Sequence, residues 1–107
     1  MSIQELPSVG PWKVLAASGR IDALTGADTE KACHAALDQA PKVALDLRAV
    51  RYMSSAGLRV LLSSLKYAAA RQGAFVLIAP QEAVREVLEM SGFAKILAIV
   101  PDGADLP

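Results

Sequence analysis

Six apolar residues in a row, AFVLIA at positions 74–79, lie between a glycine and a proline. A strand with one face in water alternates apolar and polar residues, whereas an unbroken apolar run of this length is typical of a strand covered on both faces. Strands of that kind occur mainly in parallel sheets, whose crossover helices cover them. The run therefore predicts a central strand of an α/β sheet.

The rest of the chain alternates between strand-like and helix-like patterns. Apolar runs predict three further strands, at positions 12–19, 43–47 and 95–100. Apolar residues at helical spacing predict three helices between the strands, at positions 25–41, 57–73 and 80–92. This alternation predicts one α/β domain over residues 1–107, with a mostly parallel or mixed central sheet and packed helices.

Residues at the element ends refine these boundaries. Thr25 followed by Asp28 has the spacing of a capping box, and Gly73 is expected to end the second helix as its C-cap. The segment from Leu47 to Tyr52 is expected to be an irregular link. Proline and glycine punctuate residues 1–10 and 101–107, so we expect loose termini around a core of about residues 12–100.

Charge and hydropathy exclude several classes of protein. Eleven basic residues balance eleven acidic ones, and no basic stripe is present, so a nucleic-acid partner is not expected. No apolar stretch approaches the roughly 20 residues needed to cross a bilayer, so membrane insertion is not expected. The first ten residues lack the apolar core of a signal peptide. We therefore expect a cytoplasmic protein.

The sequence contains few residues that indicate a catalytic site or a metal site. Cys33 is the only cysteine and His34 the only histidine, which is too few for a metal site, and Cys33 is expected to be a small buried hydrophobe. No glycine-rich phosphate-binding motif is present, so no cofactor is expected. A hydrolase elbow around Ser55 would need a glycine where Met53 stands. Asp46 alternates with leucines in a strand, a pattern that packing explains, so it does not indicate a carboxylate pair with Asp22. No catalytic residue is identified, and an enzyme is not expected.

Ser54 and Ser55 lie where the second helix should begin. One of them could simply be the N-cap, and the residues alone favour that interpretation. The same position also suits phosphorylation, because a phosphate there would face unpaired backbone N–H groups and the positive end of the helix dipole. Both interpretations stay open at this point.

Three stretches resemble one known family. VALDLRAVRYMSSAGLRVLL resembles the central signature of STAS domains, in particular those of bacterial anti-sigma factor antagonists. GRIDALT is similar to the family's early motif, and PQEAVREVLEMSGFAKIL to its closing helix and strand. Together they cover roughly residues 12–100 in the expected order, so the chain is identified as a member of the STAS family.

The resemblance implies a binding protein in a partner-switching circuit. Such a protein binds an anti-sigma factor that is also a serine kinase, is released when that kinase phosphorylates it, and is reset by a serine/threonine phosphatase of the metal-dependent class. The phosphoacceptor corresponds to Ser55. The partner surface corresponds to a set of residues in two motifs: Asp22, Thr25, Ser54, Ser55, Gly57, Leu58 and Arg59.

One position departs from the common family pattern. Many members carry aspartate directly before the phosphoserine, where this chain has Ser54, so Ser54 is a second candidate acceptor. The resemblance also leaves an alternative function open, that of a docking subunit in a phospholipid-transport ABC complex, which would need no phosphorylation. The sigma factor, the stimulus, the output and the oligomeric state are not specified by the sequence.

Overall fold

The computed structural model describes residues 2–107. Within this range the chain forms five strands, three α-helices and two short 3-10 helices. In chain order the elements are β1 (Ser2–Val9), β2 (Trp12–Ile21), α1 (Gly26–Gln39), β3 (Lys42–Met53), α2 (Ser55–Ala70), β4 (Ala74–Ile78), α3 (Glu82–Met90), η1 (Phe93–Lys95), β5 (Ala98–Val100) and η2 (Gly103–Asp105).

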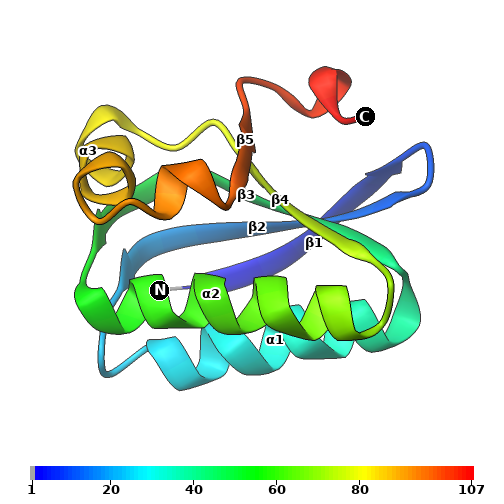
Figure 1. The fold of residues 1–107 in the computed structure, drawn as a ribbon, viewed down its shortest axis with the longest axis horizontal. Helices are drawn as coiled ribbons and strands as arrows, with labels where there is room; N and C mark the ends of the chain where they lie inside the picture. The colour runs from blue at the N-terminus through cyan, green and yellow to red at the C-terminus, as the bar shows by residue number, and fades with distance from the viewer. Residues whose placement is uncertain (1) are drawn as a thin grey trace.

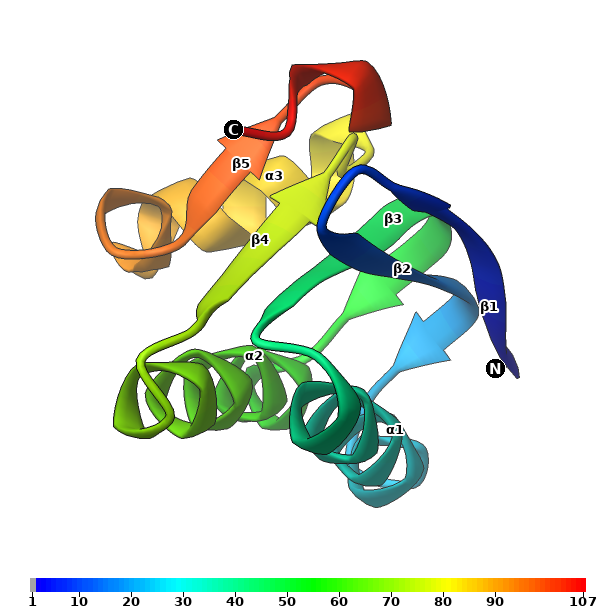
Figure 2. The same cartoon turned by 90° about the vertical axis from the view of Figure 1, so that its right-hand side faces the viewer.

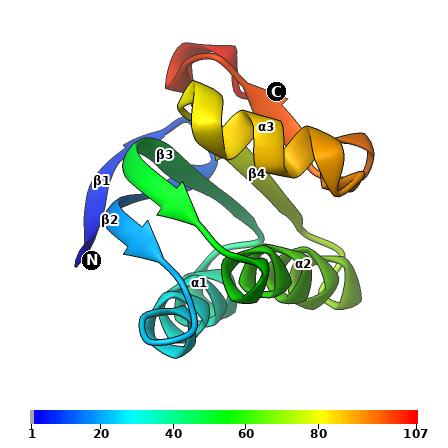
Figure 3. The same cartoon turned by 90° about the vertical axis from the view of Figure 1, so that its left-hand side faces the viewer.

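The strands form one mixed sheet in the order β1-β2-β3-β4-β5. β1 pairs with β2 antiparallel, and β2 to β5 are mutually parallel. A helix connects each parallel pair, and α1 and α2 lie side by side, whereas α3 lies apart from them with its axis in another direction (Figures 1 and 3). The α/β class and the mixed sheet predicted from the sequence are confirmed.

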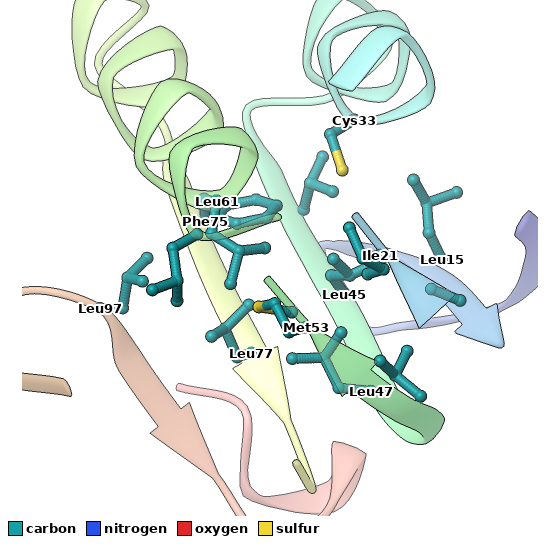
Figure 4. Packing of buried hydrophobic residues seen from close by; sticks show 14 of the residues in the cluster. Leu15, Ile21, Cys33, Leu45, Leu47, Met53, Leu61, Phe75, Leu77 and Leu97 are labelled. Carbon is teal, nitrogen blue, oxygen red and sulfur yellow. The ribbon is translucent and has the colours of Figure 1, made fainter. Parts of the chain in front are cut away.

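Both faces of β4 are buried, as the six-residue apolar run predicted. On one face Phe75 and Leu77 of β4 join a large cluster, in which Figure 4 shows them with Cys33 of α1 and Leu61 of α2. Buried residues of α3 belong to the same cluster. On the other face Val76 and Ile78 join a smaller cluster that contains Trp12. Because the side chains of a strand alternate between faces, one apolar strand supplies both clusters.

Within residues 2–107 both ends of the chain are packed on the sheet, contrary to the loose termini that we expected. β1 forms one edge of the sheet and pairs with β2 (Figure 2). The pairing runs from Ser2 opposite Ser18 to Val9 opposite Trp12. At the other end the indole Nε1 of Trp12 donates a hydrogen bond of 2.8 Å to the carbonyl oxygen of Pro107. β1 escaped prediction because an edge strand tolerates proline and exposed polar residues.

β3 is twelve residues long, so the irregular link expected from Leu47 to Tyr52 was also wrong. The strand continues to Met53 and stays paired with β2, with register shifts on either side of Gly19. These irregularities bring residues of β3 to the surface out of alternation, which hid the strand from a pattern search.

Gly73 is needed for a different reason from the one expected. The left-handed residue after α2 is Gln72, at φ 58°, and Gly73 follows it with its N–H bonded to the carbonyl of Ala68. A Cβ atom on Gly73 would lie 2.1 Å from the carbonyl oxygen of Pro41. Close approach of two backbones therefore requires the glycine.

Candidate functional site

The residues singled out from the sequence meet at one end of the molecule. β2 and β3 end side by side, and their connections lead directly into α1 and α2 (Figure 3). The backbone N–H of Ser54 donates to the carbonyl of Ile21 at 3.0 Å, which ties the start of α2 to the end of β2. In open α/β sheets this carboxyl edge of the strands is where binding sites form.

Asp22 organises the loop between β2 and α1. Its Oδ1 accepts hydrogen bonds from the backbone N–H of Leu24 at 3.0 Å and of Thr25 at 3.2 Å. Partial burial opposes ionisation of Asp22, but these bonds and the Thr25 hydroxyl outweigh it and lower the pKa of the carboxyl below its usual value. The loop is therefore held by an ionised aspartate.

Thr25 does not form the capping box that its spacing predicted. Thr25 is the N-cap residue of α1, but its side chain makes no capping bond. Its hydroxyl instead donates to the carbonyl of Arg20 at 2.8 Å and accepts from the N–H of Asp22 at 3.0 Å. The loop, rather than the helix end, uses this hydroxyl.

The two serines have different surroundings. Ser54 is the N-cap of α2, and its half-buried Oγ accepts a hydrogen bond of 3.4 Å from the N–H of Gly57. Ser55 is the first residue of the helix, is exposed, and its hydroxyl bonds to none of residues 2–107. Capping therefore occupies Ser54, while the hydroxyl of Ser55 has no partner in the described part of the chain.

Gly57 and Leu58 pack the start of α2 against the sheet. A Cβ atom on Gly57 would lie 2.6 Å from the carbonyl oxygen of Ile21 and 2.7 Å from Cγ of Met53, so any larger residue would push α2 away from the sheet. Leu58 is 7% exposed and packs in the large hydrophobic cluster that contains Phe75 and Leu77. Its side chain does not line the surface for which it was proposed, whereas Arg59 is exposed.

Three neighbours of the site were not singled out from the sequence. The guanidinium carbon of Arg20 lies 4.3 Å from the ring centroid of Tyr52, and Arg20 Nε lies 3.5 Å from Asp22 Oδ2. Leu24, in the loop that Asp22 holds, is 90% exposed. The register of β2 against β3 places Arg20 opposite Tyr52, a contact that the sequence alone does not reveal.

The sequence profile of the STAS domain matches residues 1–105. This chain belongs to the STAS domain family. Solved structures of similar fold include an anti-sigma factor antagonist from Mycobacterium paratuberculosis, with a TM-score of 0.81 and 28% identity over 94% of this chain and 87% of that one. Another is SpoIIAA, an anti-sigma factor antagonist in its unphosphorylated form, with a TM-score of 0.76 and 18% identity over 94% of this chain and 90% of that one.

A curated relative is more similar in sequence over a shorter stretch. BtrV of Bordetella bronchiseptica, named as a candidate anti-sigma factor antagonist, is 47% identical over 58 residues, which are 54% of this chain. The match spans half of that relative's length.

Away from the site, the STAS domain's other reactive side chains serve packing. Cys33 is fully buried, and burial raises the pKa of its thiol to about 11, which fits the expected buried hydrophobe. Asp46 Oδ1 accepts a hydrogen bond of 2.9 Å from the backbone N–H of Arg48 and lies 3.4 Å from Nε of Arg48. Both contacts of Asp46 are therefore with a residue of the same strand. No helix within residues 2–107 has the length and apolar character to cross a bilayer.

His34 belongs to a polar cluster between α1 and α2, which we call the outer seam. Its ring stacks on Tyr67 with centroids 4.0 Å apart, and its Nε2 lies 3.2 Å from the hydroxyl of Ser63. The Tyr67 hydroxyl donates to Asp38 at 2.7 Å, and Arg71 reaches both of them, at 2.6 Å and 3.2 Å. The outer seam holds the two helices together.

Proposed function

We propose that this STAS domain is a cytoplasmic, non-catalytic anti-sigma factor antagonist, which binds an anti-sigma factor with serine kinase activity and is released from it by phosphorylation of Ser55. One observation carries the proposal: the free, exposed hydroxyl of Ser55 at the first position of α2. The names of the Bordetella and Mycobacterium proteins support the same function.

Ser55 is a better acceptor than Ser54 for a structural reason. A kinase must bring the attacking hydroxyl into line with the γ-phosphate of ATP, and the hydroxyl of Ser55 can turn freely toward it. Phosphorylation of Ser54 would first require breaking the hydrogen bond that its Oγ accepts from the N–H of Gly57. Ser54 then keeps the helix capped while its neighbour is modified.

The chemistry is supplied by the partners rather than by this chain. The kinase transfers the γ-phosphoryl group of ATP to Ser55 Oγ, with loss of the hydroxyl proton and release of ADP. A metal-dependent serine/threonine phosphatase restores the hydroxyl by hydrolysis. The phosphate adds roughly 1.5 to 2 negative charges.

The position of the phosphate explains how a switch could leave the fold intact. At the first position of α2 it lies at the positive end of the helix dipole, where negative charge stabilises a helix. Arg59 follows four residues later, so its guanidinium is on the same helix face. The phosphate would therefore alter the charge of the surface without melting the helix beneath it.

The test is a co-purification from the native host with Ser55→Ala and Ser55→Asp baits, followed by mass spectrometry. We expect the alanine bait to retain a kinase-fold anti-sigma factor and the aspartate bait to lose it. Ser8→Asp, at an exposed serine of β1, adds the same charge elsewhere and should retain the partner.

Two outcomes would contradict the proposal. If the purified kinase phosphorylates Ser54 or leaves Ser55→Ala as good a substrate as the wild type, the acceptor is wrong. If both baits capture the same ABC-transporter subunits equally, the chain is a docking subunit of a phospholipid-transport complex and Ser55 has no switching role.

A further inference from the structure

Leu24 is an apolar side chain that is 90% exposed on a loop with a fixed backbone. Its N–H bonds to Asp22 Oδ1 at 3.0 Å, and the loop closes where the N–H of Gly26 donates to the carbonyl of Asp22 at 2.7 Å. Binding costs less when the contacting segment is already ordered. A protruding leucine on such a loop is therefore suited to insertion into a partner.

Leu24 is connected to a second apolar side chain by a chain of contacts. Asp22, which holds Leu24, pairs with Arg20 at 3.5 Å, and the guanidinium of Arg20 covers the ring of Tyr52 at 4.3 Å. Tyr52 is 44% exposed and stands two residues before Ser54. The loop that carries Leu24 and the exposed ring of Tyr52 thus lie at the same end of the molecule, beside the start of α2.

The unpaired charge at this end of the molecule is positive. Asp22 is neutralised locally by Arg20. Arg51 of β3 and Arg59 of α2 are exposed and form no ion pair within residues 2–107. Residues 20–28 and 51–59, which meet at this end of the molecule, together carry three arginines and two carboxylates, although the whole chain has no net charge.

We propose that Leu24 and Tyr52 are the apolar anchors, and Arg59 the charged contact, of a docking surface for a folded protein that presents an apolar pocket bordered by carboxylates. This inference rests on the proposed function, since that partner is the anti-sigma factor. It adds the chemistry of the partner's side of the interface. Leucine and tyrosine supply buried area, and the arginine supplies specificity for an acidic border.

The chain offers matched controls for Leu24 and for Arg59. Met90, at the end of α3, is 88% exposed and outside the contacts that connect Leu24 to Tyr52. Lys66 is an exposed cation on α2, about two helical turns beyond Arg59. Leu24→Ser and Met90→Ser remove equally exposed apolar side chains, and Arg59→Glu and Lys66→Glu reverse equally exposed charges.

The experiment compares these four unphosphorylated variants, the wild type and Ser55→Asp as baits in the native host, with each captured protein identified, purified and its Kd measured. We expect a partner that Met90→Ser and Lys66→Glu bind within about twofold of the wild type. We expect Leu24→Ser and Arg59→Glu to bind the same partner at least about tenfold more weakly. Rising salt should weaken wild-type binding, because an acidic border is screened.

The outcomes separate this inference from the phosphorylation switch. If Ser55→Asp loses the partner while Leu24→Ser and Arg59→Glu keep it, the docking surface is wrong and the switch stands. If Leu24→Ser and Arg59→Glu lose a partner that Ser55→Asp keeps, the docking surface stands and the switch is wrong. The inference is overturned if no protein distinguishes the wild-type bait from empty resin. It is also overturned if light scattering shows self-association that Leu24→Ser abolishes, since the occupant is then a second copy.

Discussion

The site end of the molecule and the outer seam between α1 and α2 use polar side chains in opposite ways. In the outer seam Tyr67 bonds to Asp38, Arg71 to both, and the His34 ring stacks on Tyr67. At the site the backbone is tied down just as firmly, through Asp22 and Ser54, but Ser55 is left without a partner among residues 2–107.

The difference separates polar side chains that take part in packing from polar side chains that remain exposed. A polar network in which each member has a partner stabilises packing and offers little to another molecule. Exposed side chains without partners on a rigid backbone are available for binding at low entropic cost. Four predictions test this contrast, beginning with the largest expected effect.

Gly57→Ala should destabilise the site end most. The added Cβ meets the carbonyl oxygen of Ile21 at 2.6 Å, and overpacking of this kind costs about 3 kcal/mol in the free energy of unfolding. Gly103→Ala is the control, because its Cβ would lie 3.8 Å from Val9, an ordinary contact, and should cost less than about 0.5 kcal/mol. Urea denaturation measures both, and equal costs would show that the close approach of α2 to β2 is not required.

Ser54→Ala and Ser55→Ala should differ in stability although the two serines are adjacent. Loss of the N-cap bond to Gly57 should cost about 1 kcal/mol. Loss of the unbonded hydroxyl of Ser55 should change the free energy of unfolding by less than about 0.5 kcal/mol. Denaturation curves of both variants decide this, and the reverse ranking would mean that Ser55 is the structural serine.

Asp22→Asn should remove a pH dependence of stability. The hydrogen-bonded carboxylate has a lowered pKa in the folded chain, so its contribution is present above the unfolded pKa of about 3.9 and is lost as pH falls through the folded pKa. The wild type should therefore be more stable than the variant at neutral pH, and the gap should close in acid. Thermal denaturation across that range measures the gap, and a gap that widens in acid would contradict the assignment.

Tyr67 should show the smallest effect, a spectroscopic one. The hydrogen bond it donates to Asp38 raises the pKa of its phenol, so the contribution of this bond is present below the unfolded pKa of about 10 and is lost as pH rises through the folded pKa. In a Tyr52→Phe background, absorbance titration should place the ionisation of Tyr67 above that of free tyrosine. Asp38→Asn should bring it down without changing partner binding.

The fold was largely predictable from the sequence, because burial on both faces leaves a visible apolar run. β1 was missed because SIQELPSV is a mostly exposed edge strand in which proline interrupts the pattern. The second half of β3 was missed because register shifts place Arg48, Ala49, Arg51 and Tyr52 on the surface out of alternation. Local periodicity does not record which strand a segment pairs with.

The site was predictable as a set of motifs but not as a surface. Asp22, Ser55 and Arg59 stand out in the sequence, while Leu24 does not, because nothing local distinguishes an exposed leucine from a buried one. Leu58 is the converse case, a motif residue whose side chain is in the core. Exposure depends on the packing of β2 against α2, which only the folded chain reveals.

The hydrogen bond from Trp12 to Pro107 makes tryptophan fluorescence a probe of the C-terminal segment. Trp12 is the only tryptophan, so the intrinsic emission of the protein arises mainly from one indole, which is hydrogen-bonded to a carbonyl 95 residues away. Release of that carbonyl hydrates the indole and shifts its emission to the red. Fluorescence therefore reports on the packing of the smaller cluster around Trp12. Far-ultraviolet circular dichroism follows the helices on the opposite face of the sheet. Recorded together during unfolding, the two signals show whether the packing on the two faces is lost at the same time.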